Sequence, residues 1–340
     1  MTNEYMKKTA IKASVFAAVA MVLMLYRAAT KHIMITDAAG APIDRGQTLE
    51  SYNLLVDRKV PEGREGTLII PISRNVSSDN IILEDDYIDH ELRIYIESRE
   101  EGFYLDNPVV TDLDILKGAV CVPQNESGSV CLDFTTDELY VNESTLTENS
   151  TIEVKFFKPS QKYEHVAVID VAGESDGAGG DPSLDVALLL KDIADKDTDR
   201  SIKLYFTRLS ERRVSEDERL LLVTESEADL CVSLDLQAAA GDKESGFSAF
   251  FNDRYFRRSM TNAEFADIVL RNCASNSGTD AAGIYAAPDD DFIRSLTVPS
   301  ARLCLDITGD AGAEAYDDTY KRKVAEGLYN AIVEALGEME

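Results

Sequence analysis

The sequence predicts an N-terminal membrane anchor, then an all-β module, then an α/β domain with a mixed sheet flanked by helices. Three observations lead to this order. An apolar stretch flanked by cations opens the chain, residues 32–160 alternate short β-type runs with turns, and residues 161–340 alternate strand-like runs with amphipathic helices. We therefore divide the chain into residues 1–31, 32–160 and 161–340.

Composition limits the classes of partner. The 340 residues include 62 acidic and 34 basic side chains, which gives a formal net charge of -28, and 44% of the residues are apolar. This length favours more than one folded unit, and this apolar share is enough for real hydrophobic cores. So negative a charge argues against nucleic acid and against an anionic membrane surface as the main partner. We expect no nucleic-acid partner.

The N-terminal segment is typical of an exported protein. Three lysines within the first 12 residues precede an apolar stretch from Ala13 to Tyr26, and Arg27 follows it without a clean cleavage site. A transmembrane helix needs about 20 residues, which residues 9–29 supply if the cations at both ends reach the headgroups. The sequence predicts an uncleaved signal anchor, with a cleaved signal peptide as the alternative. The lysines place the tip in the cytoplasm, so we expect a single-pass protein of the cell membrane whose bulk is extracytoplasmic.

The middle region has the pattern of half-buried strands. Apolar and polar residues alternate in its clearest runs, which are residues 67–72, 92–97, 120–121, 130–134 and 151–157. No segment here has a sustained helical period, so the region predicts a sandwich or a barrel. Its place between an anchor and a second domain suggests a spacer or a module that binds the cell wall or a partner.

Two cysteines flank a turn in this region. Cys121 and Cys131 lie on either side of residues 125–128, at nearly opposite positions of an expected hairpin. They form a possible disulfide if the compartment oxidises thiols and the geometry allows the bond. No Cys-x-x-Cys or Cys/His spacing occurs in the chain, which excludes a structural zinc ribbon.

The last region alternates strands and helices. We expect strands at residues 165–171, 202–207, 229–235, 246–251 and 301–307, and helices at residues 183–194, 215–226, 261–273 and 317–336. This alternation predicts an α/β sheet with helices on both faces. Functional sites in such sheets lie at the carboxyl ends of the strands.

Four ordered segments carry a family resemblance. They are Val-Ile-Asp at residues 168–170 before a Gly-rich loop, Phe-Thr-Arg at 206–208, Arg219 with Ala-Asp-Leu-Cys-Val-Ser at 228–233, and residues 299–306. They resemble V-I-D-P-G-H-G-G, L-T-R, R…A-D-x-F-V-S-I-H-A-N and P-A-V-L-V-E of the zinc-dependent N-acetylmuramoyl-L-alanine amidases. These are the peptidoglycan amidases of bacterial cell envelopes. The resemblance spans residues 165–340 and implies a hydrolase fold tied to peptidoglycan.

The resemblance also implies that the zinc ligands are replaced. The positions of the family's two His ligands read Gly173 and Asp235, its Glu ligand falls at or near Ser183, and its catalytic Glu reads Asp306. A catalytic zinc needs neutral imidazoles and few carboxylates. Two of the three His in the chain lie outside this domain, and His165 lies at the wrong end of its strand. We therefore expect no zinc cofactor and assign no catalytic residue.

Carboxylates offer a second possibility. Glu174, Asp176, Asp235 and Asp306 are candidates to meet at the carboxyl edge of the sheet. Such a cluster suits Ca²⁺ or Mg²⁺, although acids in so acidic a chain are more simply solvated loop residues. Without a usable His, a Ser-His-Asp or Cys-His arrangement is excluded in this domain. Residues 254–258, Arg-Tyr-Phe-Arg-Arg, form a basic-aromatic patch suited to an anionic glycan or peptide carboxylate, or simply an ordinary exit from a strand.

Three functions remain open. The first is a membrane-anchored cell-wall pseudoenzyme that binds peptidoglycan or a cell-envelope protein without hydrolysis. The second is an active amidase that cleaves the amide bond between N-acetylmuramic acid and L-alanine with a non-standard metal shell of Glu174, Asp235 and Asp306. The third makes the β module the functional part and the α/β domain its platform. The simultaneous replacement of three ligand positions favours the first.

Overall fold

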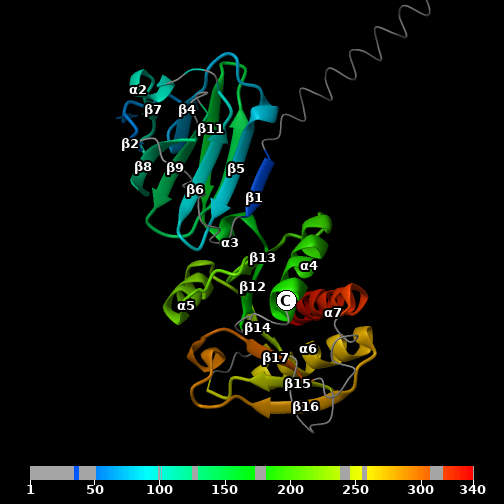
Figure 1. The fold of residues 1–340 in the computed structure, drawn as a ribbon. Coiled ribbons are helices and arrows are strands. Elements are labelled where there is room, and N and C mark those ends of the chain that lie inside the picture. Colours follow the sequence, from blue (N-terminus) through cyan, green and yellow to red (C-terminus); the bar gives the residue numbers. More distant parts are fainter. Residues whose placement is uncertain are drawn as a thin grey trace, which may run out of the picture.

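A computed structural model of the chain shows a β module above an α/β domain (Figure 1). It describes residues 34–37, 51–98, 100, 102–124, 129–172, 181–237, 246–254, 259–306 and 317–339. The predicted signal anchor lies outside these ranges. Among the helices that the structure describes, none combines the length and the apolar character that a membrane crossing requires.

The β module consists of two sheets. The first has the order β1 (Met34–Asp37), β5 (Ile81–Asp86), β6 (Glu91–Ile96), β9 (Val130–Thr136), β8 (Leu116–Pro123) and β2 (Tyr52–Asn53). The second has the order β10 (Val141–Leu146), β11 (Thr151–Phe157), β4 (Thr67–Pro71), β7 (Val109–Val110) and β3 (Val56–Asp57). Ile94 and Leu132 of the first sheet share one buried core with Ile70 and Val154 of the second. The module is therefore a sandwich, one of the two architectures expected.

The possible disulfide between Cys121 and Cys131 is not formed. In the pairing of β8 with β9, Cys121 lies opposite Leu132, whereas Val122 lies opposite Cys131. Because successive side chains of a strand point to opposite faces, Cys121 enters the sandwich core and Cys131 points to the other face. Both thiols are free and buried, and burial raises the pKa of the Cys131 thiol to about 12. The two cysteines are not joined in the predicted disulfide, because the register of β8 and β9 is offset by one residue from the pairing that would place them opposite each other.

The α/β domain contains one mixed sheet. Its order is β13 (Ile202–Phe206), β12 (His165–Val171), β14 (Leu230–Gln237), β17 (Ser300–Asp306), β15 (Gly246–Phe251) and β16 (Ala281–Ala286). Neighbouring strands are parallel, except that β15 runs antiparallel to β17. The five expected strands are present, and β16 is the strand that the sequence pattern missed. Its residues, Ala-Ala-Gly-Ile-Tyr-Ala, lack the apolar alternation of a half-buried strand.

The two faces of this sheet are covered differently. Helices α4 (Pro182–Lys196), α6 (Asn262–Ser277) and α7 (Asp318–Met339) pack on one face and bury the main core of the domain. The other face carries α5 (Glu216–Glu225) and the short η2 (Phe292–Ser295), and its buried cluster also includes residues of the β module. Helices on both faces were expected, but part of the second face is covered by β structure.

The β module reaches this face through the turn between β5 and β6. The Tyr87 hydroxyl donates to the carbonyl of Phe206 (2.9 Å) and accepts from its backbone N–H (3.0 Å). Asp89 accepts two hydrogen bonds from Arg212 (2.5 and 2.7 Å), and these bonds lower the pKa of the Asp89 carboxyl. A helical turn, α3 (Pro159–Lys162), joins the two parts along the chain. The module is therefore held against the domain by these hydrogen bonds, and its role as a spacer or a binding module stays a prediction.

Candidate functional site

A buried carboxylate closes the carboxyl end of β12. Asp170 is fully buried and accepts two hydrogen bonds from Arg219 Nη1 (3.0 Å to each oxygen), one from Ser233 Oγ (2.7 Å) and one from Thr207 Oγ1 (3.2 Å). Arg219 comes from α5, Ser233 from β14, and Thr207 directly follows β13. The carboxylate is thus neutralised by one guanidinium and saturated by two hydroxyls, so this network holds the strands and α5 together and offers no reactive group.

The segments on both sides of residues 173–180 are held by Arg208. Its Nε donates to the carbonyl of Val171 (3.0 Å), and its Nη2 binds the Asp181 carboxylate (2.5 Å). Asp181 also caps α4 by accepting from the N–H of Leu184 (3.0 Å). The predicted site residues between these two points, Gly173, Glu174 and Asp176, lie outside the described residues.

Ser183 has a structural role. Its buried hydroxyl accepts a hydrogen bond from the backbone N–H of Leu236 (2.9 Å), which ties the first turn of α4 to the end of β14. A neutral hydroxyl already engaged in this way is not the carboxylate that the family's zinc would need at this position.

Asp235 lies beside an arginine. The register of β14 and β17 places Asp235 opposite Cys304, whose thiol is 3.8 Å from the carboxylate, and Arg302 Nη1 lies 3.7 Å from Asp235 Oδ2. The same guanidinium binds Asp291 (3.0 Å) and covers the ring of Phe250 (4.7 Å to its centroid). A fixed positive charge is therefore next to the predicted ligand position.

These residues do not fit a zinc centre. The domain's one histidine, His165, begins β12 and lies 3.6 Å from Asp229, at the amino end of the sheet. Asp306 ends β17, opposite Gln237 of β14, and its side chain is outside what the structure describes. The described residues at the carboxyl end include no imidazole, and Asp235 lies next to a cation, so these residues lack the neutral ligands that make zinc electrophilic. Convergence of the four predicted carboxylates remains a prediction.

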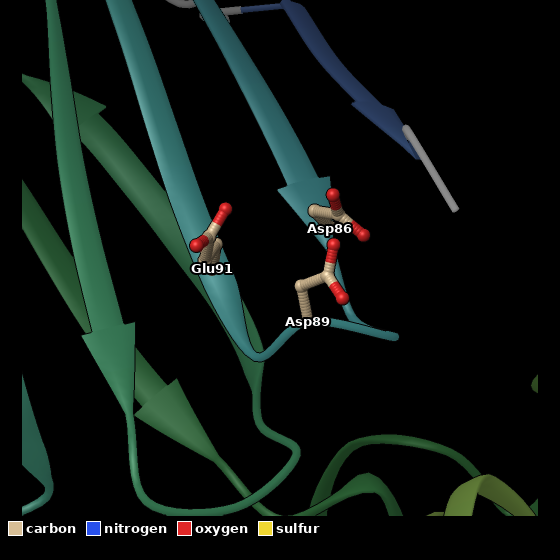
Figure 2. Close-up of side chains that lie close together, drawn as sticks. All are labelled: Asp86, Asp89 and Glu91. Carbon is tan, nitrogen blue, oxygen red and sulfur yellow. The ribbon is translucent and has the colours of Figure 1, made fainter. Parts of the chain in front are cut away.

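A cluster of three carboxylates that no sequence pattern indicated lies in the β module. Asp86, Asp89 and Glu91 flank the turn between β5 and β6 (Figure 2), with one oxygen of each within 4.8 Å of the others. Arg93 contacts Asp86 (2.9 Å) and Glu91 (2.5 Å), while Arg212 binds Asp89. Two guanidinium groups compensate three carboxylates, so the group is an ion-pair network at the module interface rather than a metal centre. No sequence pattern links Arg212 to the β module.

The predicted basic-aromatic patch is described only at its first residue. Arg254 lies 3.0 Å from Asp289, and both side chains are mostly exposed. The other four residues of the patch, 255–258, are outside the described residues, and ligand binding there stays a prediction.

One family model matches most of the second domain. The family model described as N-acetylmuramoyl-L-alanine amidase matches residues 178–334. No curated protein matches the chain. This part of the chain is therefore an amidase-like α/β domain with a mixed sheet and flanking helices.

Several solved amidase structures are similar to about half of this chain. The N-acetylmuramoyl-L-alanine amidase of Clostridium difficile 630 is 20% identical, with 51% of this chain and 97% of that chain covered and a TM-score of 0.44. The catalytic domain of CwlV from Bacillus (Paenibacillus) polymyxa var. colistinus is 20% identical, with 51% and 98% covered and a TM-score of 0.43. The CwlD amidase of Clostridioides difficile, solved in complex with the GerS lipoprotein, is 16% identical, with 51% and 99% covered and a TM-score of 0.44.

Proposed function

We propose that this chain is a membrane-anchored, extracytoplasmic cell-wall protein whose amidase-like domain binds peptidoglycan without cleaving it. The observation that carries the proposal is the guanidinium of Arg302, 3.7 Å from the carboxylate of Asp235. The resemblance implies a neutral imidazole at the position of Asp235 and a zinc ion bound to it, whereas Asp235 is a carboxylate with a guanidinium beside it.

Charge explains why this arrangement disfavours a catalytic metal. A divalent cation bound to Asp235 would lie within a few ångströms of the guanidinium, and their repulsion is of the order of several kcal/mol even in a partly solvated site. Arg302 also cannot move away freely, because it binds Asp291 and covers Phe250. Hydrolysis of an amide needs an activated water, and the described residues at this edge include no imidazole that would help to activate one.

The retained fold supports binding. The match over residues 178–334 ties the domain to a family named for N-acetylmuramoyl-L-alanine cleavage, and the core strands and helices of the domain are intact. The turn that carries Tyr87 fixes the β module to the same domain. Any surface that binds the cell wall is therefore held in a set orientation relative to the module and, beyond it, to the predicted anchor.

The test combines binding, cleavage and metal content of the full chain in detergent. We expect co-sedimentation with purified peptidoglycan sacculi, no release of stem peptides from them, and no stoichiometric zinc by elemental analysis. Asp235→Ala is expected to leave the metal content unchanged. One zinc per chain that is lost in Asp235→Ala, together with release of stem peptides, would overturn the proposal in favour of an active amidase with a non-standard metal shell. Failure to co-sediment would reject peptidoglycan as the ligand.

A further inference from the structure

A row of side chains crosses the sheet from Asp235 to its outer edge. The pairings place Asp235 of β14 opposite Cys304 of β17, Cys304 opposite Ser248 of β15, and Ser248 opposite Gly283 of β16. These four strands are consecutive neighbours in the sheet (Figure 1). At about 4.8 Å per strand the row is about 14 Å long, and beyond Asp235 its side chains are small. It therefore runs from the candidate site to the edge strand.

The ring of Tyr285 lies over the outer end of this row. Its hydroxyl donates to the carbonyl of Ala282 in the same strand (3.2 Å). A Cβ on Gly283 would lie only 3.1 Å from the Tyr285 hydroxyl oxygen, so the ring leans along β16 and covers the glycine. Gly283 also has a φ of 142°, which other residues rarely adopt. The glycine thus allows the ring to take this position.

Two neighbours hold the ring in place. The Phe250 ring lies 5.8 Å from that of Tyr285, at an angle of 39°. Arg302 covers Phe250 and is the same guanidinium that lies beside Asp235. Arg302, Phe250 and Tyr285 therefore form a continuous stack beside the row, which we name the aromatic ledge. Despite this packing, Tyr285 remains 49% exposed.

We propose that Tyr285 is a sugar-stacking residue, on which a pyranose ring of the peptidoglycan glycan strand rests. This inference depends on the proposed function and names the part of the ligand that the ledge receives. A ring already ordered by its neighbours loses little conformational freedom on binding, and its open face is apolar while its edge is polar. A neutral sugar, with an apolar C–H face and hydroxyls at its rim, matches this surface.

Local charge favours a neutral ligand. The guanidinium of Arg302 is compensated by Asp291 and Asp235, so the ledge has no uncompensated positive charge that would attract an anion. Aromatic faces also attract organic cations, but Arg302 already occupies the face of Phe250. The edge strand itself, from Ala281 to Ala286, carries no charged side chain in a protein with a net charge of -28. The edge strand thus differs from the strongly charged remainder of the chain.

The test measures binding of the full chain to sacculi and its competition by a soluble N-acetylglucosamine hexamer. We expect Tyr285→Ala to weaken binding about tenfold, in line with losses when an aromatic stacking partner is removed. Tyr285→Phe should stay close to the wild type, because the ring remains. Ile284→Ala is the matched control, since Ile284 is also exposed but points to the opposite face of the same strand.

The outcomes separate this inference from the function on which it rests. If the wild type binds sacculi and Tyr285→Ala binds equally well, the sugar-stacking role is wrong and the proposed function stands. The role is also wrong if Ile284→Ala weakens binding as much as Tyr285→Ala, or if the hexamer does not compete. If the wild type fails to bind sacculi, the proposed function itself fails.

Discussion

The crossing of α6 and α7 leaves no room for a side chain at Gly327. A Cβ there would lie 2.8 Å from Cys273 Cα and 2.9 Å from the carbonyl oxygen of Asn272, both backbone atoms of α6. Since tight carbon contacts begin near 3.4 Å, Gly327→Ala must push the helices apart by roughly half an ångström in a close-packed core. Such overpacking costs about 1–3 kcal/mol, and the better helix propensity of Ala returns up to about 1 kcal/mol. We therefore expect a net loss of up to about 2 kcal/mol.

The same helix supplies a control for this substitution. Gly337 also lies in α7, but a Cβ there would have no neighbour within 4 Å. Gly337→Ala should therefore leave the free energy of unfolding unchanged or raise it by up to about 1 kcal/mol. Urea unfolding followed by far-ultraviolet circular dichroism, with the slopes compared as well as the midpoints, measures both variants. Equal stability of the two variants would refute the close helix contact.

Two further predictions concern the interface between the modules. Tyr87→Phe removes the hydroxyl that pairs with the buried backbone N–H and carbonyl of Phe206, so it should lower the free energy of unfolding, measured by thermal unfolding, by about 1–3 kcal/mol. Tyr140→Phe is the control and should be neutral, because the Tyr140 hydroxyl donates to the exposed Asp137. Equal effects of the two substitutions would show that the Tyr87 hydroxyl does not stabilise the interface. Hydrogen bonds from Arg212 lower the pKa of Asp89 in the folded protein. The ion pair therefore contributes its full stabilisation at pH values above the ordinary pKa of an aspartate. This stabilisation is lost as the pH falls through the lowered pKa of Asp89 in the folded protein. Asp89→Asn should therefore lower stability at neutral pH by about 1 kcal/mol and reduce the decline measured between pH 5 and pH 2; an unchanged decline would contradict this ion pair.

Some features of the chain follow from local sequence alone. Apolar residues at helical spacing predict the helix from Ser183 to Ala194, and the structure extends it only to Pro182–Lys196. The strand predicted at residues 165–171 is observed at His165–Val171. Such elements are predictable because the burial period of a strand or helix is written in consecutive residues. The prediction that Gly173, Ser183 and Asp235 replace metal ligands also comes from the sequence, through the family resemblance, and it stays a prediction.

Contacts between distant segments depend on the tertiary structure. Arg302 lies beside Asp235 because β14 and β17 pair in one register, and a shift of one residue would turn the guanidinium to the other face of the sheet. The same kind of shift separates Cys121 from Cys131. Register and the docking of the β module depend on packing energies summed over segments far apart in the chain, and no local pattern encodes them. The sequence by itself therefore determined most of the strands and helices and the resemblance from which the replaced ligand positions are predicted. The tertiary structure decided the strand register, the edge strand β16 and the contacts of Asp235 with residues far away in the chain.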